Sequence, residues 1–407
     1  MDIAVDILLA AAALAGTVYL LRKQVNLGIV MLLDSVFIVL IARMPADRAL
    51  LSAVNGALSE STVMLILILF LIMMIENIMR STGMIRSMTD SLKELVGSNR
   101  LAAGLLPAVI GLLPSPGGAR FSCPMVEETA AEAADKDNKA FINYWFRHIW
   151  LDGFILYPGI ILAAGLLNVS VISLFLRLIP FMLVSILLGS VYGLRHVKKV
   201  KTVRTKPVKE SLRTFIISML PVLTVIAAYI ALLNVTPYSL ELSAGSMVII
   251  LFAVKKYSLA DMLKTVRDAF PLKLVLIILG VMVFKEILLE SGAITGLSGF
   301  MDTYGIPAAI LFILLPFVGG FTSGITVSFV SLTFPILIPL GLGENLWYAA
   351  IAYAAGSIGG MITPLHLCAV MTADYFKTSL TALLRKIAIA EAPLLIMTAA
   401  LLLLLSI

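Results

Sequence analysis

The stretch LLPSPGGARFSCP, Leu112 to Pro124, places three prolines, two glycines and an arginine between apolar sequence and a charged run. Leu101–Leu113 before it is too short to span a bilayer comfortably, and Pro114–Gly118 cannot continue a helix without losing backbone hydrogen bonds. A second short helix then reaches about Glu128. Because both ends of this unit face hydrophilic sequence, we interpret residues 101–128 as a re-entrant hairpin whose tip stops inside a membrane. Irregular backbone at that depth must be buried in protein or line a water-filled cavity.

The composition agrees with a membrane setting. The chain has 407 residues, of which 60% are hydrophobic and 13% charged, and its mean hydropathy is +1.06, far above that of soluble domains. Several apolar runs are about 20 residues long, enough to cross the hydrocarbon core as helices. They are Val63–Met79, Val171–Leu194, Phe215–Leu233, Leu272–Leu289 and Ala382–Leu405. We therefore expect an all-α integral membrane protein.

A basic segment divides the chain near its middle. Arg195–Arg213 carries eight Lys and Arg residues and one acid, Glu210, so its net charge is +7 (8 − 1), against +6 for the whole chain. The positive-inside rule places such a loop in the cytoplasm. We interpret it as a topological anchor and not as a nucleic-acid site, and we expect no nucleic-acid partner.

The two halves contain related sequences. LLPAVIG (Leu105–Gly111) and LLPFVGG (Leu314–Gly320) agree at five of seven positions with an offset of 209 residues. A weaker set of identities follows at an offset of 206, pairing Gly153, Pro158 and Ala163 with Gly359, Pro364 and Ala369. If each half has five full spans and one re-entrant hairpin, the odd number of spans forces the halves into opposite orientations.

The loop charges agree with this inversion. Four basic residues, Arg80, Arg86, Lys93 and Arg100, follow the third span of the first half, whereas Glu290–Gly305 at the equivalent place has no Lys or Arg. We predict inverted-topology repeats over residues 1–194 and 213–407, joined by a cytoplasmic linker over 195–212. About ten transmembrane helices are expected near 3–21, 27–43, 60–79, 141–166, 171–194, 213–233, 238–254, 270–289, 345–370 and 381–405. Pro45–Ser59 and Ser258–Ala269 are expected to form interfacial arm helices.

The second half repeats the opening device. GGFTSGITVSFVSLTFP, Gly319–Pro335, predicts a re-entrant hairpin over about 306–340 with its tip at Thr322–Gly324. GFILYP (Gly153–Pro158) and GSIGGMITP (Gly356–Pro364) predict two broken helices, whose freed carbonyls and half-helix ends can bind substrate and coupling ion. Close helix packing through small residues is the competing interpretation of both segments.

These motifs resemble the ion transporter superfamily, which includes divalent-anion/sodium symporters, gluconate and citrate permeases, and the large membrane subunits of tripartite carboxylate transporters. The resemblance rests on SPGGARFSCP, TSGITVSFVSLTFP and AAGSIGGMITP, although neither tip has the asparagine that is common in the symporters. It implies a homodimer in the cell (inner) membrane, with a scaffold domain and a transport domain that moves as an elevator. It also implies sodium or proton coupling, an anionic substrate and no other cofactor.

Two sets of candidate site residues follow. The substrate-binding candidates are Ser115, Pro116, Gly117, Gly118, Arg120, Thr322, Ser323, Gly324, Thr363 and Pro364. The coupling-ion candidates, with sodium as the only metal considered, are Ser115, Asp152, Thr322, Ser323, Thr326, Gly356, Ser357 and Gly360.

Charges inside the membrane are costly, so each indicates a function or a partner. Arg120, about one turn past the first tip, can clamp a carboxylate or phosphate bidentately or pair with Asp152 or Glu127. Asp152 is a candidate for a proton site, a sodium site or an arginine partner. Arg147 is expected to pair with an acid of the Glu127–Asp137 run. We treat His148, His366, Cys123 and Cys368 as ordinary buried residues, and Glu76, Glu286 and Asp374 as interfacial.

We therefore predict a secondary active transporter that moves a small anionic solute, an organic carboxylate in the first instance, and no enzymatic activity. The first alternative is the membrane subunit of a multicomponent importer that receives substrate from a solute-binding protein. A remote alternative is an intramembrane serine hydrolase that uses Ser323 with His366. The absence of a GxxxxGK[ST] loop argues against a primary pump.

Overall fold

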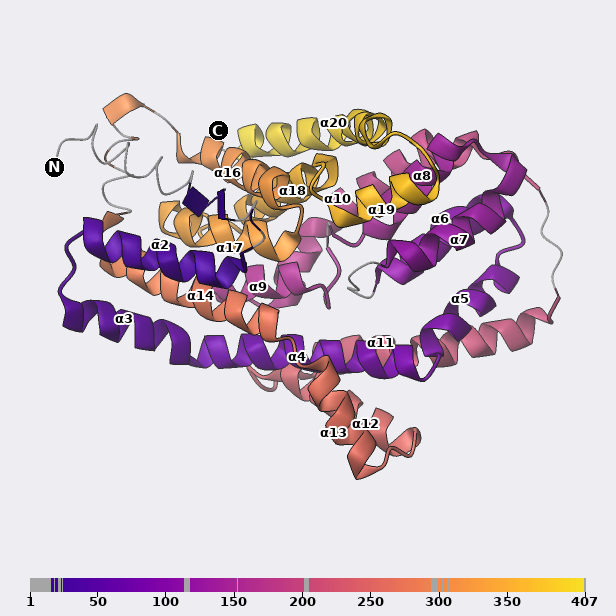
Figure 1. Ribbon diagram of the computed structural model, residues 1–407, viewed down its shortest axis with the longest axis horizontal. Coiled ribbons are helices and arrows are strands. Elements are labelled where there is room, and N and C mark those ends of the chain that lie inside the picture. Colours follow the sequence, from indigo (N-terminus) through magenta and orange to yellow (C-terminus); the bar gives the residue numbers. More distant parts are fainter. Residues whose placement is uncertain are drawn as a thin grey trace.

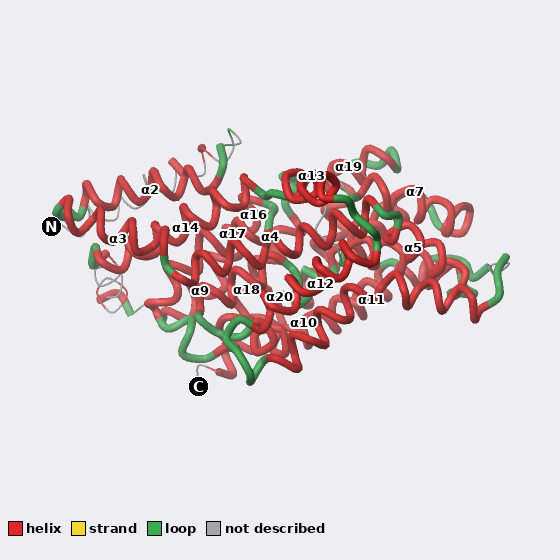
Figure 2. The backbone as a smooth tube through the Cα atoms, turned by 90° about the horizontal axis from the view of Figure 1, so that it is seen from below, coloured by secondary structure: helices red, strands yellow, loops and turns green. Residues whose placement is uncertain are grey.

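The computed structural model describes residues 16–17, 19–20, 23, 25–112, 118–151, 153–200, 205–293, 299, 301, 303–305 and 307–405 (Figure 1). Within these ranges every element longer than three residues is an α-helix (Figure 2). The all-α class predicted from the sequence is therefore confirmed. The first predicted span, residues 3–21, lies almost entirely outside the described residues.

The helices of the first half follow the predicted segments closely. They are α2 (Leu27–Ile41), α3 (Ala46–Leu58), α4 (Glu60–Ser81), α5 (Met84–Leu95), α6 (Asn99–Gly111), α7 (Ala119–Ala130), α8 (Lys136–His148), α9 (Pro158–Leu167) and α10 (Val171–Tyr192). Short polar side chains begin several of them: Ser59, Asp135 and Ser170 each accept a backbone N–H from the first turn of α4, α8 and α10. Such caps satisfy donors that the helix itself leaves free.

The second half continues with helices in the same order. They are α11 (Val208–Leu232), α12 (Ser239–Val254), α13 (Leu259–Ala269), α14 (Leu272–Glu290), α16 (Ala308–Ser323), α17 (Thr326–Leu337), α18 (Leu346–Ile362), α19 (Leu367–Tyr375) and α20 (Leu380–Leu405). Because α11 already begins at Val208, the last residues of the expected linker, 208–212, are helical. The linker before it is held by α6, since Asn99 and Val200 exchange hydrogen bonds and Arg100 donates to Val197.

Length and apolar composition identify a membrane protein. In the described part of the chain five helical stretches are long and apolar enough to cross a bilayer: Ala46–Ser81, Val171–His196, Val208–Leu232, Leu346–Tyr375 and Leu380–Leu405. Large apolar side chains face outward along the helices, for example Leu40, Ile249 and Ile396, which are 69%, 69% and 68% exposed. So much exposed apolar surface is unusual for a soluble monomer and suits a lipid environment.

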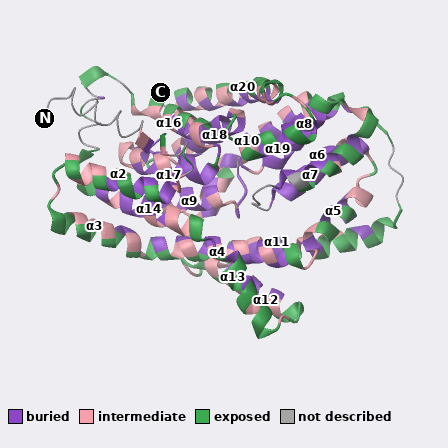
Figure 3. Cartoon of the chain, in the orientation of Figure 1, coloured by how far each residue is buried: buried purple, intermediate pink, exposed green. Residues whose placement is uncertain are grey.

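The helices form two groups. In the first, α14 packs on α2 and α3, α4 packs on α12 and α13, and α5 packs on α11. In the second, the hairpins α6–α7 and α16–α17 pack around α8, α18, α10 and α20. Figure 1 shows α3, α4 and α11 along one long side of the molecule and α20 along the other. The most buried helices lie in the second group, where most of α18 and all of the later part of α8 are buried (Figure 3).

The two halves exchange contacts reciprocally. Helix α7 of the first half packs on α19 of the second, and α17 of the second packs on α9 of the first. The starting residues of three helix pairs, α6 and α16, α9 and α19, and α10 and α20, are each 209 residues apart: Asn99 and Ala308, Pro158 and Leu367, Val171 and Leu380. The helix bounds thus favour one offset throughout, in place of the 206 expected for the later identities.

Candidate functional site

The described hairpin α16–α17 turns at Gly324 and Ile325, slightly later than the sequence predicts. Helix α16 continues through Ser323, and the hydroxyls of Thr322 and Ser323 donate to the carbonyls of Val318 (2.8 Å) and Gly319 (2.7 Å). Gly324 ends the helix with a φ of +66°, a conformation that glycine adopts without strain. The two hydroxyls are therefore engaged by their own helix in this conformation.

The first hairpin is described only in its legs. Ser115, Pro116 and Gly117 lie outside the described residues, as does Asp152. Gly118 is buried at the N-cap of α7. Arg120 is the second residue of α7, and its side chain lies outside the described part of the chain.

The tip of the second hairpin lies against the break between α18 and α19. A Cβ atom on Gly324 would lie 3.2 Å from the Cα of His366 and 3.2 Å from Cγ2 of Thr363. Thr363 is buried and its hydroxyl accepts the N–H of Leu365, whereas Pro364 is exposed. The structure thus brings three predicted substrate-binding residues together at this break: Gly324, Thr363 and Pro364.

The break does not fall at the glycines that were expected to produce it. Helix α18 is continuous through Gly356, Gly359 and Gly360 and ends at Ile362. These glycines admit close neighbours instead, because a Cβ on Gly356 would lie 2.3 Å from the ring of Phe329 and one on Gly359 2.1 Å from the carbonyl oxygen of Phe317. The competing interpretation, helix packing through small residues, is therefore correct for the 356–360 stretch.

The remaining coupling-ion candidates are distributed over neighbouring helices. Ser357 on α18 has a buried hydroxyl without a hydrogen-bond partner among the described residues. Thr326 begins α17 beside Gly159 of α9, where a Cβ on the glycine would lie 2.9 Å from the threonine Oγ1. The carbonyl of Gly360 accepts a hydrogen bond from His366 Nδ1 at 3.0 Å.

The first broken helix lies where the sequence predicts it. Helix α8 ends at His148 and α9 begins at Pro158. Between them Gly153 adopts a φ of +144°, a backbone conformation that side chains rarely tolerate. Trp150 fixes the start of the break by donating from Nε1 to the carbonyl of Ala108 on α6 (2.6 Å).

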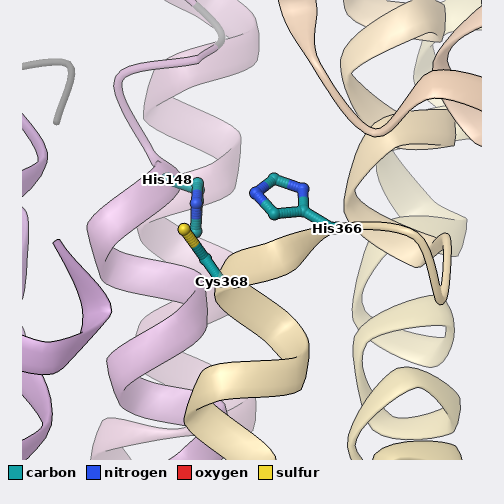
Figure 4. A group of neighbouring side chains, drawn as sticks. All are labelled: His148, His366 and Cys368. Carbon is teal, nitrogen blue, oxygen red and sulfur yellow. The ribbon is translucent and has the colours of Figure 1, made fainter. Parts of the chain in front are cut away.

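Three ligand-type side chains meet where the two breaks cross. Figure 4 shows His148 at the end of α8 and His366 and Cys368 at the start of α19, with their side chains directed toward one another. One potential ligand atom from each lies within 4.8 Å of the other two. The imidazole rings of His148 and His366 meet edge to face, with centroids 4.7 Å apart. Two histidines separated by more than half the chain therefore form one cluster.

Tyr144 holds this cluster from one side. It is fully buried on α8, donates its hydroxyl to the carbonyl of Met361 on α18 (3.0 Å), and contacts both imidazole rings. Its own carbonyl accepts a hydrogen bond from His148 Nδ1 (2.5 Å). The tyrosine thus links the two broken helices and fixes the orientation of His148.

Arg147 places a buried positive charge beside the cluster. Its side chain is 6% exposed and donates from Nη1 to Cys368 Sγ at 3.1 Å. We expected a pair with an acid of the Glu127–Asp137 run, but the carboxylate of Glu127 pairs with Lys139 at 2.9 Å. Arg147 instead lies near Glu76, which is 7% exposed on α4 and therefore not interfacial as predicted.

The second cysteine belongs to a neighbouring polar contact. Asn143 of α8 donates to Cys123 Sγ on α7 (3.1 Å) and to the hydroxyl of Thr372 on α19 (3.0 Å). Both cysteines are free and buried, as the sequence predicts. Cys368, however, is part of a polar cluster and not simply a small core residue.

Sequence reasoning singled out His366 and Cys368 separately and did not join them to His148 or Arg147. The usable signal was their spacing: a histidine and a cysteine two positions apart, directly after the Pro364 break, present both side chains at the start of one short helix. His148 lies 218 residues earlier, and only the crossing of the two broken helices brings it to them.

Comparison with curated proteins gives no match. A sequence model of one protein family, however, matches residues 5–406, nearly the whole chain. The match covers both hairpins, both broken helices and the histidine–cysteine cluster. The chain therefore belongs to the family described as protein of unknown function, DUF401.

Proposed function

We propose that this chain is a multi-pass transporter of the cell (inner) membrane that moves a small anionic solute by secondary active transport. The observation that carries the proposal is the buried guanidinium of Arg147 at the crossing of two interrupted helices. Charges within membrane helices are costly and commonly line substrate or ion pathways. Interrupted helices supply free backbone groups at the same place.

The architecture supports this proposal. The constant shift of 209 residues and the reciprocal packing of α7 on α19 and α17 on α9 support two structural repeats, which we propose are inverted in the membrane. With α6–α7 and α16–α17 as re-entrant hairpins, about ten helices span the bilayer. The group formed by these hairpins and α8–α10 and α18–α20 is the proposed transport domain.

The remaining helices are the proposed scaffold. Helices α2 to α5 and α11 to α14 pack mainly among themselves, so the transport domain can move against them as an elevator in a homodimer. Sodium or protons are the proposed coupling ions. Arg120 remains the anion-binding candidate from the sequence, and the structure adds Arg147.

Binding is the first property to test, because a ligand that binds only the folded state raises the unfolding midpoint by mass action. We expect one class among carboxylates, phosphate and sulfate to stabilise the purified protein. The panel is run in sodium and again with potassium in its place. Stabilisation that requires sodium indicates sodium coupling; stabilisation that is equal in both indicates protons.

The role of Arg147 is tested by Arg147→Lys, which keeps the charge but loses the planar fork that binds oxyanions bidentately. We expect at least about a tenfold loss of anion affinity, or roughly 1.4 kcal/mol. Arg177→Lys is the matched control, since Arg177 donates to Ser173 within α10 away from the crossing. Arg120→Ala is tested beside it. Wild-type affinity in Arg147→Lys would remove the central support for this proposal.

A further inference from the structure

The cluster of His148, His366 and Cys368 has a composition that anion transport does not require. Two imidazoles and a thiol are the side chains that bind thiophilic transition-metal ions best. Their potential ligand atoms already lie within 4.8 Å of one another. A tetrahedral zinc ion holds its ligand atoms about 3.5 Å apart, so binding requires movements of about 1 Å in the side chains.

Both histidines are oriented as metal-binding histidines commonly are. His148 Nδ1 donates to the carbonyl of Tyr144 and His366 Nδ1 donates to the carbonyl of Gly360. Because a carbonyl accepts only from a protonated nitrogen, the neutral ring in each case keeps its lone pair on Nε2. A backbone carbonyl behind the non-ligating nitrogen is a usual means of fixing the tautomer of a metal ligand.

The thiol is equally well placed. Cys368 lies 9% exposed at the start of α19, and Arg147 donates to its sulfur at 3.1 Å. A neighbouring guanidinium favours the thiolate, which is the form that binds metals. Cys123 differs, because it accepts from the neutral amide of Asn143 and is not part of the histidine cluster.

Access and coordination number are also suitable. His366 is only partly buried and stands between two exposed leucines, Leu365 (54% exposed) and Leu367 (59%), so an ion can approach from that side. Three protein ligands leave a fourth position for water or an anion, as in sites that exchange ligands. Near Arg147 the carboxyl group of Glu76 offsets part of the positive charge.

We propose that His148, His366 and Cys368 together bind one thiophilic divalent metal ion, of which zinc is the representative, at the crossing of the two broken helices. The site joins residues from both halves of the chain. Its occupancy would fix α8 relative to α19. The proposal does not rest on transport, because metal binding is measured on the purified protein without any solute.

The test is a titration of the purified full-length protein with Co²⁺, a spectroscopic substitute for zinc. We expect one Co²⁺ per chain, with a thiolate-to-cobalt charge-transfer band in the near ultraviolet and the intense visible bands of tetrahedral cobalt. Cys368→Ser should lose the charge-transfer band, and His148→Gln and His366→Gln should each weaken binding at least about tenfold. Cys123→Ser and His196→Gln, at residues outside the cluster, should bind as the wild type does.

A second measurement covers the case in which a cluster variant does not fold. In Cys123→Ser, Cys368 is the single cysteine of the chain, and bound Zn²⁺ should slow its alkylation at least about tenfold relative to the metal-free protein. Equal alkylation rates with and without Zn²⁺ would overturn the proposal. So would a wild-type protein that binds no Co²⁺, or a charge-transfer band that persists in Cys368→Ser.

Discussion

The same backbone contact occurs in both halves of the molecule, with different side chains. In the first half, a Cβ on Gly111 of α6 would lie 2.0 Å from the carbonyl oxygen of Arg147 on α8; in the second, a Cβ on Gly320 of α16 would lie 1.9 Å from that of Gly356 on α18. Each residue of the second pair lies 209 positions after its counterpart. The first crossing therefore carries a buried arginine where the second carries a glycine that admits the ring of Phe329.

This comparison separates what the fold requires from what the chemistry requires. The glycine on the hairpin leg is needed in both halves, because no side chain fits against a helix carbonyl at that distance. The residue on the broken helix is constrained differently: Arg147 reaches Cys368 of the other half, whereas Gly356 only makes room. Two similar backbones thus produce one site that is chemically asymmetric.

The largest expected effect breaks the shared contact. Gly111→Ala and Gly320→Ala each place a methyl group about 2 Å from a backbone carbonyl oxygen, so the helices must separate. Overpacking of this kind typically costs about 1–3 kcal/mol, and occasionally more. We expect both variants to show a clearly lower thermal unfolding midpoint and to disperse poorly in size-exclusion chromatography.

Gly245→Ala is the control for these variants. Gly245 lies within α12, where an added Cβ would meet its nearest neighbour, Leu71, at 3.8 Å, an ordinary contact. Alanine is favoured over glycine in a helix by about 0.8–1 kcal/mol, so this variant should be as stable as the wild type or more so. If Gly111→Ala unfolds normally while Gly320→Ala does not, the two crossings are not equivalent.

A smaller effect is expected at the tyrosines of the two crossings. Tyr144 and Tyr353 are 209 positions apart and both are fully buried. Tyr144→Phe keeps the ring contacts with His148 and His366 but removes the hydrogen bond to the Met361 carbonyl. We expect a loss of about 1 kcal/mol in the free energy of unfolding, measured as a lower unfolding midpoint.

Tyr348→Phe provides a matched comparison for Tyr144→Phe. Tyr348 also donates its hydroxyl to a backbone carbonyl, that of Leu405 at 3.1 Å, but it is only partly buried. Because water can replace the lost partner there, its removal should be less damaging. An equal or larger effect for Tyr348→Phe would mean that the Tyr144 bond contributes nothing particular to the crossing.

Much of the helical framework could be predicted from the sequence. The pattern of apolar runs predicts 238–254 and 270–289, and the structure has α12 at Ser239–Val254 and α14 at Leu272–Glu290. The GFILYP break also lies as expected, because Pro158 cannot donate to a preceding helix and starts α9. These features depend on residues close together in the chain.

The candidate site could not be predicted in the same way. Whether Gly356 and Gly359 break a helix or pack it depends on Phe329 and the Phe317 carbonyl, which come from the hairpin. Likewise, Arg147 near an acidic run predicts an ion pair, yet Lys139 takes Glu127 and Arg147 turns to Cys368. Such choices are decided by which helices cross, and local sequence carries no signal for that.

The smallest expected effect concerns a contact that the second half lacks. Glu94 at the end of α5 accepts hydrogen bonds from the Thr205 hydroxyl (2.6 Å) and from the Thr205 backbone N–H (2.8 Å), and so holds the linker before α11. The position 209 residues later is Thr303, which has no carboxylate. The hydrogen bond from the Thr205 hydroxyl, more than any other cause, lowers the pKa of Glu94 below its ordinary value of 4.5.

The sign of the pH effect follows from that direction. A carboxyl group whose folded pKa is depressed stabilises the contact above its unfolded pKa, and this contribution is lost as the pH falls through the folded pKa. We expect hydrogen exchange at the Thr205 amide to be about two- to fivefold faster in Glu94→Gln than in the wild type at pH 7, within the range of weak surface interactions. At a pH below the folded pKa the two proteins should exchange alike, since the wild-type group is then neutral as well. A difference that persisted there would show that the glutamate's charge is not what holds the linker.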